Sequence, residues 1–169
     1  MISLRAANPQ DDAAIREVVR QAFGREEEAQ LVDALRAEDV VLLELVAEDD
    51  DTLVGHILFS ALPLLSPEKM VHAAALAPLS VHPKYQRRGI GGALIHMGQA
   101  MLTHQGVEAV VVLGHPDYYT RYGFSAELAA NLDHPFPPGP HFMARELEPG
   151  ALDGLRLSTC YPRAFGLQA

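Results

Sequence analysis

The sequence predicts a single α/β domain, and three observations support this prediction. The 169 residues are 49% hydrophobic and 21% charged, which is typical of one ordinary globular domain. Amphipathic helical patterns in the first part of the chain lie between segments that are alternating or continuously apolar. A strand, a helix and a second strand then follow within about forty residues, which is a βαβ-type unit. We therefore expect one domain over residues 1–169, with a core over 1–147 and a C-terminal extension over 148–169.

The first elements are expected to be a strand, two helices and a hairpin. Asn8 and Pro9 supply an N-cap and a first-turn proline for the longer of these helices. The three consecutive aspartates 49–51 are interpreted as the turn of the hairpin, because no EF-hand spacing follows them. The expected elements are, in chain order, a strand over 2–6, a helix over 9–23, a shorter helix after the acidic run 26–28, and strands over 40–47 and 53–64.

The second half contains the βαβ-type unit. Pro78 lies inside its first strand and cannot donate a hydrogen bond to a neighbouring strand, so we expect a bulge or a separation there. Gly106 closes the helix that follows. The expected elements are a strand over 72–81, a helix over 89–105, a strand over 109–113, an aromatic segment over 118–124, a proline-rich loop over 134–141 and a last strand over 142–147.

Acidic residues are unevenly distributed. The net charge of −9 argues against binding to nucleic acid or to anionic membranes. Residues 69–107 nevertheless contain no Asp or Glu, and Lys69, Lys84, Arg87 and Arg88 give this stretch a charge of +4, which leaves −13 for the rest. The stretch is either simply buried core, where acids are rare, or it contains a site for one compact anion.

Other features limit the class of protein. Cys160 is the single cysteine, which excludes an internal disulfide and fits a reducing compartment. No apolar run reaches the roughly 18 residues of a membrane-spanning helix, and no signal peptide is evident. The eight histidines show no spacing typical of metal ligands. We expect a cytoplasmic protein that holds no metal.

Residues 79–94 combine the features of a phosphate-binding site. An apolar strand ends, a basic loop follows, and a helix begins with glycines at 89, 91 and 92. The first N–H groups of a helix lack partners and favour anions, and glycine lets a phosphate approach the backbone. The dinucleotide fingerprint fails because Leu94 occupies its sixth position, and the Walker A pattern lacks Gly-Lys-Ser/Thr. A nucleotide-binding Rossmann protein is therefore the less favoured alternative.

The pattern Gln-x-x-Gly-x-Gly at 86–91, after an apolar strand, resembles the acetyl-CoA-binding motif of the GCN5-related N-acetyltransferases, the GNAT superfamily. The segment 118–124 resembles the Phe-Tyr-x-x-x-Gly-Phe segment of the same family. The string His-Pro-Asp-Tyr-Tyr at 115–119 and the tail 161–165 are most similar to the YhbS-like bacterial branch. The resemblance implies the GNAT (acyl-CoA N-acyltransferase) fold, a mixed and mostly antiparallel sheet flanked by helices, whose central strands splay to bind coenzyme A.

The resemblance also implies roles for individual residues. Tyr119 would face the coenzyme A sulfur and serve as the general acid for the departing thiolate. Tyr118 and Tyr122 are taken as structural or cofactor-contacting. The residues implied to bind acetyl-CoA are Leu79, Ser80, Val81, Gln86, Arg87, Arg88, Gly89, Ile90, Gly91 and Gly92.

The general base is left open. The glutamate found in some relatives aligns with Ala75, and no acid between residues 69 and 107 replaces it. The candidates are Glu44, His56, His72 or a chain of water molecules, with His115 as an assisting residue.

The expected reaction is acetyl transfer from acetyl-CoA to a primary amine of a small molecule or a protein. The negative charge of the chain favours a cationic acceptor. A homodimer is left open. Because the glutamate is missing, a non-catalytic acyl-CoA-binding or sensing domain is the alternative.

Overall fold

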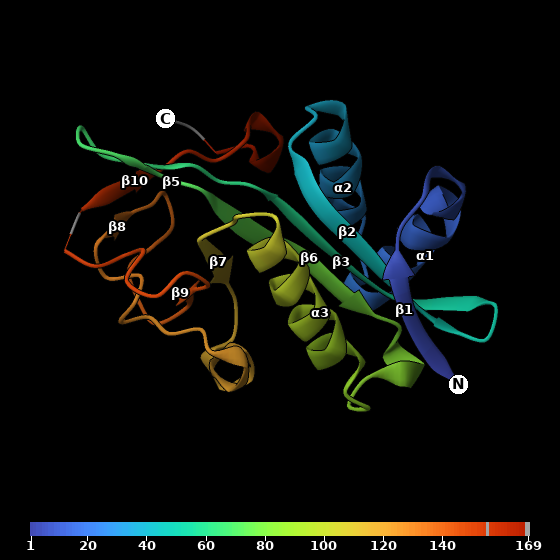
Figure 1. Cartoon of the computed structure of the whole chain (residues 1–169). Helices are drawn as coiled ribbons and strands as arrows, with labels where there is room; N and C mark the ends of the chain where they lie inside the picture. Colours follow the sequence, from blue (N-terminus) through green and yellow to red (C-terminus); the bar gives the residue numbers. More distant parts are fainter. Residues whose placement is uncertain (155, 168–169) are drawn as a thin grey trace.

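The computed structural model describes residues 1–154 and 156–167, and its centre is a six-stranded sheet (Figure 1). Neighbouring strands are antiparallel except β6 and β7, which are parallel. The expected sheet, mixed and mostly antiparallel, is therefore confirmed. In spatial order its strands are β1 (Ile2–Ala6), β2 (Val41–Asp49), β3 (Thr52–Ala61), β6 (Ala73–Val81), β7 (Ala109–Leu113) and β9 (Phe142–Glu146).

Helices cover both faces of this sheet (Figure 1). Ile57 and Phe59 of β3 pack in one hydrophobic cluster with α3 (Ile90–His104). Leu58, which lies between them, packs in another cluster with α1 (Asp12–Phe23) and α2 (Glu27–Ala37). Because successive strand residues point to opposite faces, α3 lies on one face and α1 with α2 on the other.

The first helical segment begins where the sequence predicts. A 3₁₀ turn, η1 (Pro9–Asp11), leads directly into α1. The side chain of Asn8 accepts a hydrogen bond from the N–H of Gln10, and the carboxylate of Asp11 accepts one from the N–H of Asn8. This reciprocal capping fixes the start of the helix.

Asp11 also connects the helix to β1, which allows a test of stability against pH. Arg5 donates hydrogen bonds of 2.7 and 2.8 Å to the Asp11 carboxylate, and these lower the pKa of Asp11 from 3.8 to about 2. A carboxyl group whose pKa is lower in the folded than in the unfolded protein stabilises the folded state. This stabilisation is complete at pH values above the unfolded pKa and is lost as the pH falls through the folded pKa. We expect Asp11→Asn to reduce the free energy of unfolding by about 2 kcal/mol at pH 7. Urea unfolding at pH 7 and near pH 2 measures the effect, and an equal cost at both pH values would contradict it.

β6 departs from both of its neighbours. Its register with β3 shifts so that two residues, one of them Pro78, stand opposite Leu58, which is the bulge expected at Pro78. Its pairing with β7 ends at Ala75 opposite Val111. Over residues 76–81 the two strands are no longer paired with each other, so the central strands splay as the family resemblance implies.

A second, four-stranded sheet was not predicted from the sequence. As a result, the expected strand over 53–64 ends at Ala61, and Leu64 belongs to a separate strand. Strands of two or three residues show no periodicity that could reveal them. In spatial order these strands are β5 (Met70–Val71), β4 (Leu64–Leu65), β10 (Leu157–Thr159) and β8 (Leu132–Asp133).

Short helical turns complete the chain and hold its C-terminal part in place. The Glu38 carboxylate, just after α2, accepts hydrogen bonds from the backbone N–H groups of Arg163 and Ala164, at 3.0 and 2.8 Å. These two residues belong to the last turn, η4, so this turn is fixed against α2. The short turns are η2 (Pro83–Tyr85), α4 (Pro116–Tyr119), η3 (Thr120–Tyr122) and η4 (Arg163–Phe165).

The described residues contain neither a membrane-spanning helix nor a cluster of metal-binding side chains. None of the helices in residues 1–154 and 156–167 is both long and apolar enough to cross a membrane. Within the same residues, no group of three His, Cys, Asp or Glu side chains could hold a metal ion.

Candidate functional site

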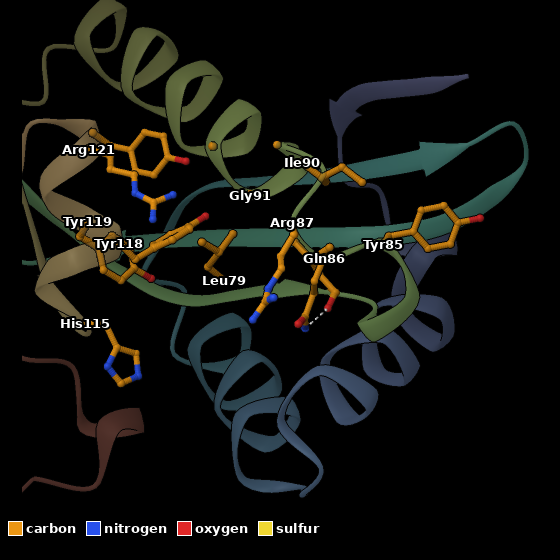
Figure 2. A pocket seen from close by; sticks show the side chains of 14 residues that line it. Leu79, Tyr85, Gln86, Arg87, Ile90, Gly91, His115, Tyr118, Tyr119 and Arg121 are labelled. Carbon is orange, nitrogen blue, oxygen red and sulfur yellow. Dashed lines mark hydrogen bonds between the residues drawn. The ribbon is translucent and has the colours of Figure 1, made fainter.

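A cleft of about 740 Å³ opens where β6 and β7 separate, and Figure 2 shows its walls. This volume lies in the range of small-molecule sites. The walls come from the end of β6, the loop after it, the first turn of α3, and α4 with η3. The lining residues are Leu79, Val81, Tyr85, Gln86, Arg87, Gly89, Ile90, Gly91, Gly92, His115, Tyr118, Tyr119, Arg121 and Tyr122.

The basic loop between β6 and α3 is fastened at two points. The Gln86 side-chain amide donates a hydrogen bond to the carbonyl of Val81 at 3.0 Å, the dashed line in Figure 2. The Tyr85 hydroxyl donates one to the Asp49 carboxylate, at the end of β2, at 2.8 Å. These two hydrogen bonds connect the loop to the ends of β2 and β6.

The backbone of this loop has the shape of turns that bind anions in other proteins. Arg87 and Gly89 both have positive φ angles, 64° and 81°, and such turns direct successive N–H groups into a concave surface. In the part of the chain that the structure describes, the N–H groups of residues 89–92 donate to no backbone carbonyl. They are the first N–H groups of α3, where the helix dipole also favours negative charge. The loop and the start of α3 therefore leave several N–H groups free for an anion, which is what phosphate binding at this place would require.

Cationic side chains add to this turn. The guanidinium of Arg87 extends along the cleft in Figure 2, and Arg121 lies on the opposite wall. Among the described residues, neither Arg87 nor Arg121 forms an ion pair with a carboxylate. Two unpaired cations on opposite walls of a cleft that also contains a free helix start suit a ligand with several negative charges.

The glycines of α3 also make room for tyrosine side chains. A Cβ atom on Gly91 would lie 2.3 Å from the hydroxyl oxygen of Tyr118. A Cβ atom on Gly92 would lie 2.5 Å from the hydroxyl oxygen of Tyr122. Each glycine thus lets an aromatic ring pack against the first turn of α3, and these rings form one wall of the cleft.

Tyr119 lines the same cleft and has the chemistry of a proton donor. Its ring packs against Gly114 and meets Phe124 edge-to-face at 5.8 Å. Burial raises the pKa of Tyr119 to about 12, so its hydroxyl stays protonated at neutral pH. Burial also raises the pKa of the neighbouring Tyr118.

Most residues that the resemblance implied for acetyl-CoA line this cleft, and two do not. Ser80 is buried, and its side chain lies on the face of β6 opposite to Leu79 and Val81. The guanidinium of Arg88 lies 5.0 Å above the ring of Tyr85, outside the cleft lining. The residues that do line it are Leu79, Val81, Gln86, Arg87, Gly89, Ile90, Gly91 and Gly92, together with Tyr119.

Tyr85 and Arg121 line the cleft without having been predicted there. Arg121 is a basic residue inside the aromatic segment, two positions after Tyr119. A positive charge so close to the expected catalytic tyrosine could have indicated that it lines the same site. For Tyr85, its position in the basic loop could have indicated that it lies in the binding site.

Two of the candidate bases lie together, outside the cleft lining. His56 Nε2 is 2.8 Å from the carboxylate of Glu44, and Arg36 of α2 binds the same carboxylate. Burial acts to raise the pKa of Glu44, but the hydrogen bonds from His56 and Arg36 outweigh it and lower this pKa below its usual value. His72, by contrast, is exposed and lies beside a smaller cavity of about 310 Å³.

Comparison with known proteins identifies the family. A cleft beside a glycine-rich, basic helix start is typical of proteins that bind a ligand containing phosphate. The family model of the acetyltransferase (GNAT) domain matches residues 3–126. The chain therefore belongs to the GNAT family of N-acetyltransferases, as the sequence motifs indicated.

Two Escherichia coli K12 proteins are similar in sequence. The uncharacterized N-acetyltransferase YjhQ is 40% identical over 129 residues, which cover 75% of this chain and 71% of YjhQ. The uncharacterized N-acetyltransferase YhbS is 36% identical over 131 residues, which cover 77% of this chain and 76% of YhbS.

Solved structures agree with this assignment. The E. coli GNAT family N-acetyltransferase YhbS in complex with CoA has a TM-score of 0.89 and 30% identity, covering 99% of this chain and 93% of that chain. A GNAT family acetyltransferase from Brucella melitensis in complex with acetyl-CoA has a TM-score of 0.79 and 36% identity, covering 98% of both chains. The predicted family and fold are confirmed.

Proposed function

We propose that this protein, acting as a single N-acetyltransferase domain, transfers the acetyl group of acetyl-CoA to a primary amine of a small molecule or a protein. The observation that carries this proposal is the cleft itself, which joins a phosphate-binding turn at Arg87 to a protonated tyrosine at Tyr119. Two similar structures contain CoA or acetyl-CoA, which supports the same ligand here.

The residues of the cleft fit this ligand. The free N–H groups of residues 89–92 and the Arg87 guanidinium would hold the pyrophosphate. The pantetheine arm is a chain with amide groups, and the unpaired edge of β6 at Leu79 and Val81 offers backbone donors and acceptors for it. When bound, acetyl-CoA supplies the reactive thioester.

Tyr119 would act as the general acid. The amine attacks the carbonyl carbon directly, the C–N bond forms, and the C–S bond breaks with its electron pair on sulfur. Tyr119 gives its proton to that sulfur. An ordinary thiol has a pKa of about 8.5, but the burial that raises the pKa of Tyr119 also raises that of a thiol in the same cleft, which reduces the mismatch.

Calorimetry with CoA tests the phosphate site. We expect Arg87→Ala to weaken CoA binding about tenfold, because a charge-assisted contact to phosphate contributes about 1.5 kcal/mol or more. We also expect the loss to shrink as salt is added. Lys69→Ala removes an exposed positive charge away from the cleft and serves as the control. Equal affinities for the Arg87 variant and the control would contradict the site.

A non-catalytic acyl-CoA-binding or sensing domain is the second candidate, because buried Ala75 stands where some relatives have a glutamate. Both candidates predict CoA binding, but only the first predicts release of free CoA thiol in the presence of an amine. A panel of a polyamine, an amino sugar and a peptide with a free N-terminus separates them. The net charge of −9 favours a cationic acceptor among these.

A further inference from the structure

The tyrosine wall of the cleft, formed by Tyr118, Tyr119 and Tyr122, is carried by two very short helical turns, α4 and η3. Its rings contact one another, because the ring centroid of Tyr118 lies 5.0 Å from that of Tyr119 and 5.3 Å from that of Tyr122. Turns of three or four residues have few hydrogen bonds of their own. The position of the tyrosine wall therefore depends on what holds this segment from outside.

The carbonyl oxygen of Tyr122 is the point at which two other elements hold the segment. Arg145 Nη1 of β9 donates a hydrogen bond to it at 2.6 Å, and Gln99 Nε2 of α3 donates one at 3.3 Å. Arg145 stands opposite Val110 of β7, which packs in the same hydrophobic cluster as α3, so the Arg145 side chain lies on the α3 face of the sheet. Gln99 is buried in the middle of α3. One oxygen atom therefore joins the tyrosine wall to the sheet and to the helix.

Gly123, the next residue, allows Arg145 to reach this carbonyl. Its φ angle of 90° lies in the left-handed region, which favours glycine. A Cβ atom on Gly123 would lie 2.1 Å from Nη1 and 2.8 Å from Cζ of Arg145. A larger residue would push the guanidinium away from the Tyr122 carbonyl, so the turn and the arginine fit each other.

The charge of Arg145 is not needed for packing. Its Nε atom is buried without a hydrogen-bond partner, and no carboxylate among the described residues forms an ion pair with it. Burying part of a charge without a counter-charge lowers stability, and an apolar side chain at the same place would not do so. What the charge provides is a stronger hydrogen bond to the carbonyl than a neutral donor would make. A local loss of stability that secures one atom is typical of a functional site.

We propose that Arg145 and Gln99 are positioning residues for acetyl transfer, because together they hold the tyrosine wall in place. Through this wall they keep the Tyr119 hydroxyl directed at the thioester sulfur. This inference rests on the proposed function, in which Tyr119 is the proton donor. Neither Arg145 nor Gln99 lines the cleft, so both act through the carbonyl of Tyr122 and the rings beside it. A displacement of about 1 Å at a reacting group is enough to slow a reaction strongly.

Conservative and disruptive variants of the two residues test this role. Arg145→Met, an unbranched side chain that cannot donate a hydrogen bond, is expected to lower kcat about 20-fold and to change the KM for acetyl-CoA by less than about threefold. Arg145→Lys keeps a charged donor and should retain at least about a third of the wild-type kcat. Gln99→Met removes the longer hydrogen bond and should lower kcat about threefold. Arg16→Met, at an exposed arginine of α1, is the control and should behave as wild type. Equal kcat values for the two Arg145 variants would overturn the proposal.

A double-mutant cycle with Tyr119→Phe separates positioning from a general loss of structure. If Arg145 acts through the Tyr119 hydroxyl, adding Arg145→Met to Tyr119→Phe should lower kcat further by less than about threefold. Losses that multiply in the double variant overturn the inference and leave acetyl transfer intact. A wild-type kcat in Tyr119→Phe alone removes the general-acid role and this inference with it. If wild type transfers acetyl to no amine, both the inference and the proposed function fail.

Fluorine-19 NMR of protein labelled with 3-fluorotyrosine gives a readout that needs no acceptor. The chain has five tyrosines, and single replacements by phenylalanine assign their signals. In Arg145→Met we expect the signals of the tyrosine wall to move or broaden, while the signal of Tyr161, which does not line the cleft, stays unchanged. The variant should still fold, because the backbone of Ser125 is paired with that of Ala144 on β9 by hydrogen bonds of 2.9 and 3.0 Å. Five unchanged signals would overturn the positioning role whatever the activity of the variant.

Discussion

Replacing Tyr119 with phenylalanine is expected to lower kcat for acetyl transfer about 100-fold, with little change in the KM for acetyl-CoA. The variant keeps the ring that packs against Gly114 and Phe124 and loses only the hydroxyl. The departing sulfur must then take its proton from water. Steady-state measurement of free thiol release, with the best acceptor of the amine panel, gives both constants.

Tyr161→Phe is the matched control for this experiment. Tyr161 is also a partly buried tyrosine whose pKa is raised by burial, but it does not line the cleft. Because the pKa of Tyr119 is raised to about 12, its proton is retained throughout the neutral range, so we expect wild-type kcat to show no alkaline decline from this group below about pH 10. Equal kcat values for the Tyr119 and Tyr161 variants would remove the general-acid role.

Gly98→Ala is expected to destabilise the protein, although alanine is the better helix former. A Cβ atom on Gly98, in the middle of α3, would lie 2.4 Å from Cε2 and 2.6 Å from Cζ of Phe59. Phe59 is fully buried, and close-packed protein interiors leave little room for a ring to move. We expect the free energy of unfolding to fall by about 2–3 kcal/mol in urea titrations.

A double-mutant cycle shows whether this contact is the cause. In a Phe59→Leu background the aromatic ring is gone. Adding Gly98→Ala should then lower the free energy of unfolding only slightly, or should raise it by up to about 1 kcal/mol because alanine is the better helix former. Ala100→Gly, at an exposed position of the same helix, checks that propensity. If the losses of unfolding free energy of the two single variants simply add in the double variant, the contact between Gly98 and Phe59 is not the cause.

The sequence predicted those parts of the fold whose residues repeat regularly or carry a local signal. The helix expected over 89–105 occupies Ile90–His104, and the strand over 109–113 was predicted with its observed bounds. Pro78 indicated the bulge of β6, because a missing N–H is a local property that needs no tertiary information. The second sheet depends instead on long-range pairing of very short strands, such as Leu157 beside Leu132.

In the candidate site, too, the local features were predictable from the sequence and those that depend on tertiary packing were not. The glycine-rich turn is a local feature, so the motif alone predicted residues that the structure places at the cleft, and their binding role stays a prediction. Ser80 lies between Leu79 and Val81, so strand alternation turns its side chain to the other face, whereas the position of Arg88 depends on its packing against Tyr85, which no motif encodes. The hydrogen bond between Glu44 and His56 depends on the register of β2 and β3, which is shifted at two places and cannot be counted from the turn.

The family model matches the chain only as far as residue 126, but the folded structure includes elements beyond that residue. β9, at Phe142–Glu146, pairs with the whole of β7. A chain shortened to the matched residues would leave β7 as an exposed apolar edge, with Val110 and Val111 losing cover, and such edges promote aggregation. It would also lack the C-terminal turn, and the Glu38 carboxylate would lose the two hydrogen bonds that it accepts from this turn. Expression of this enzyme for crystallisation or screening should therefore retain residues well past the family boundary.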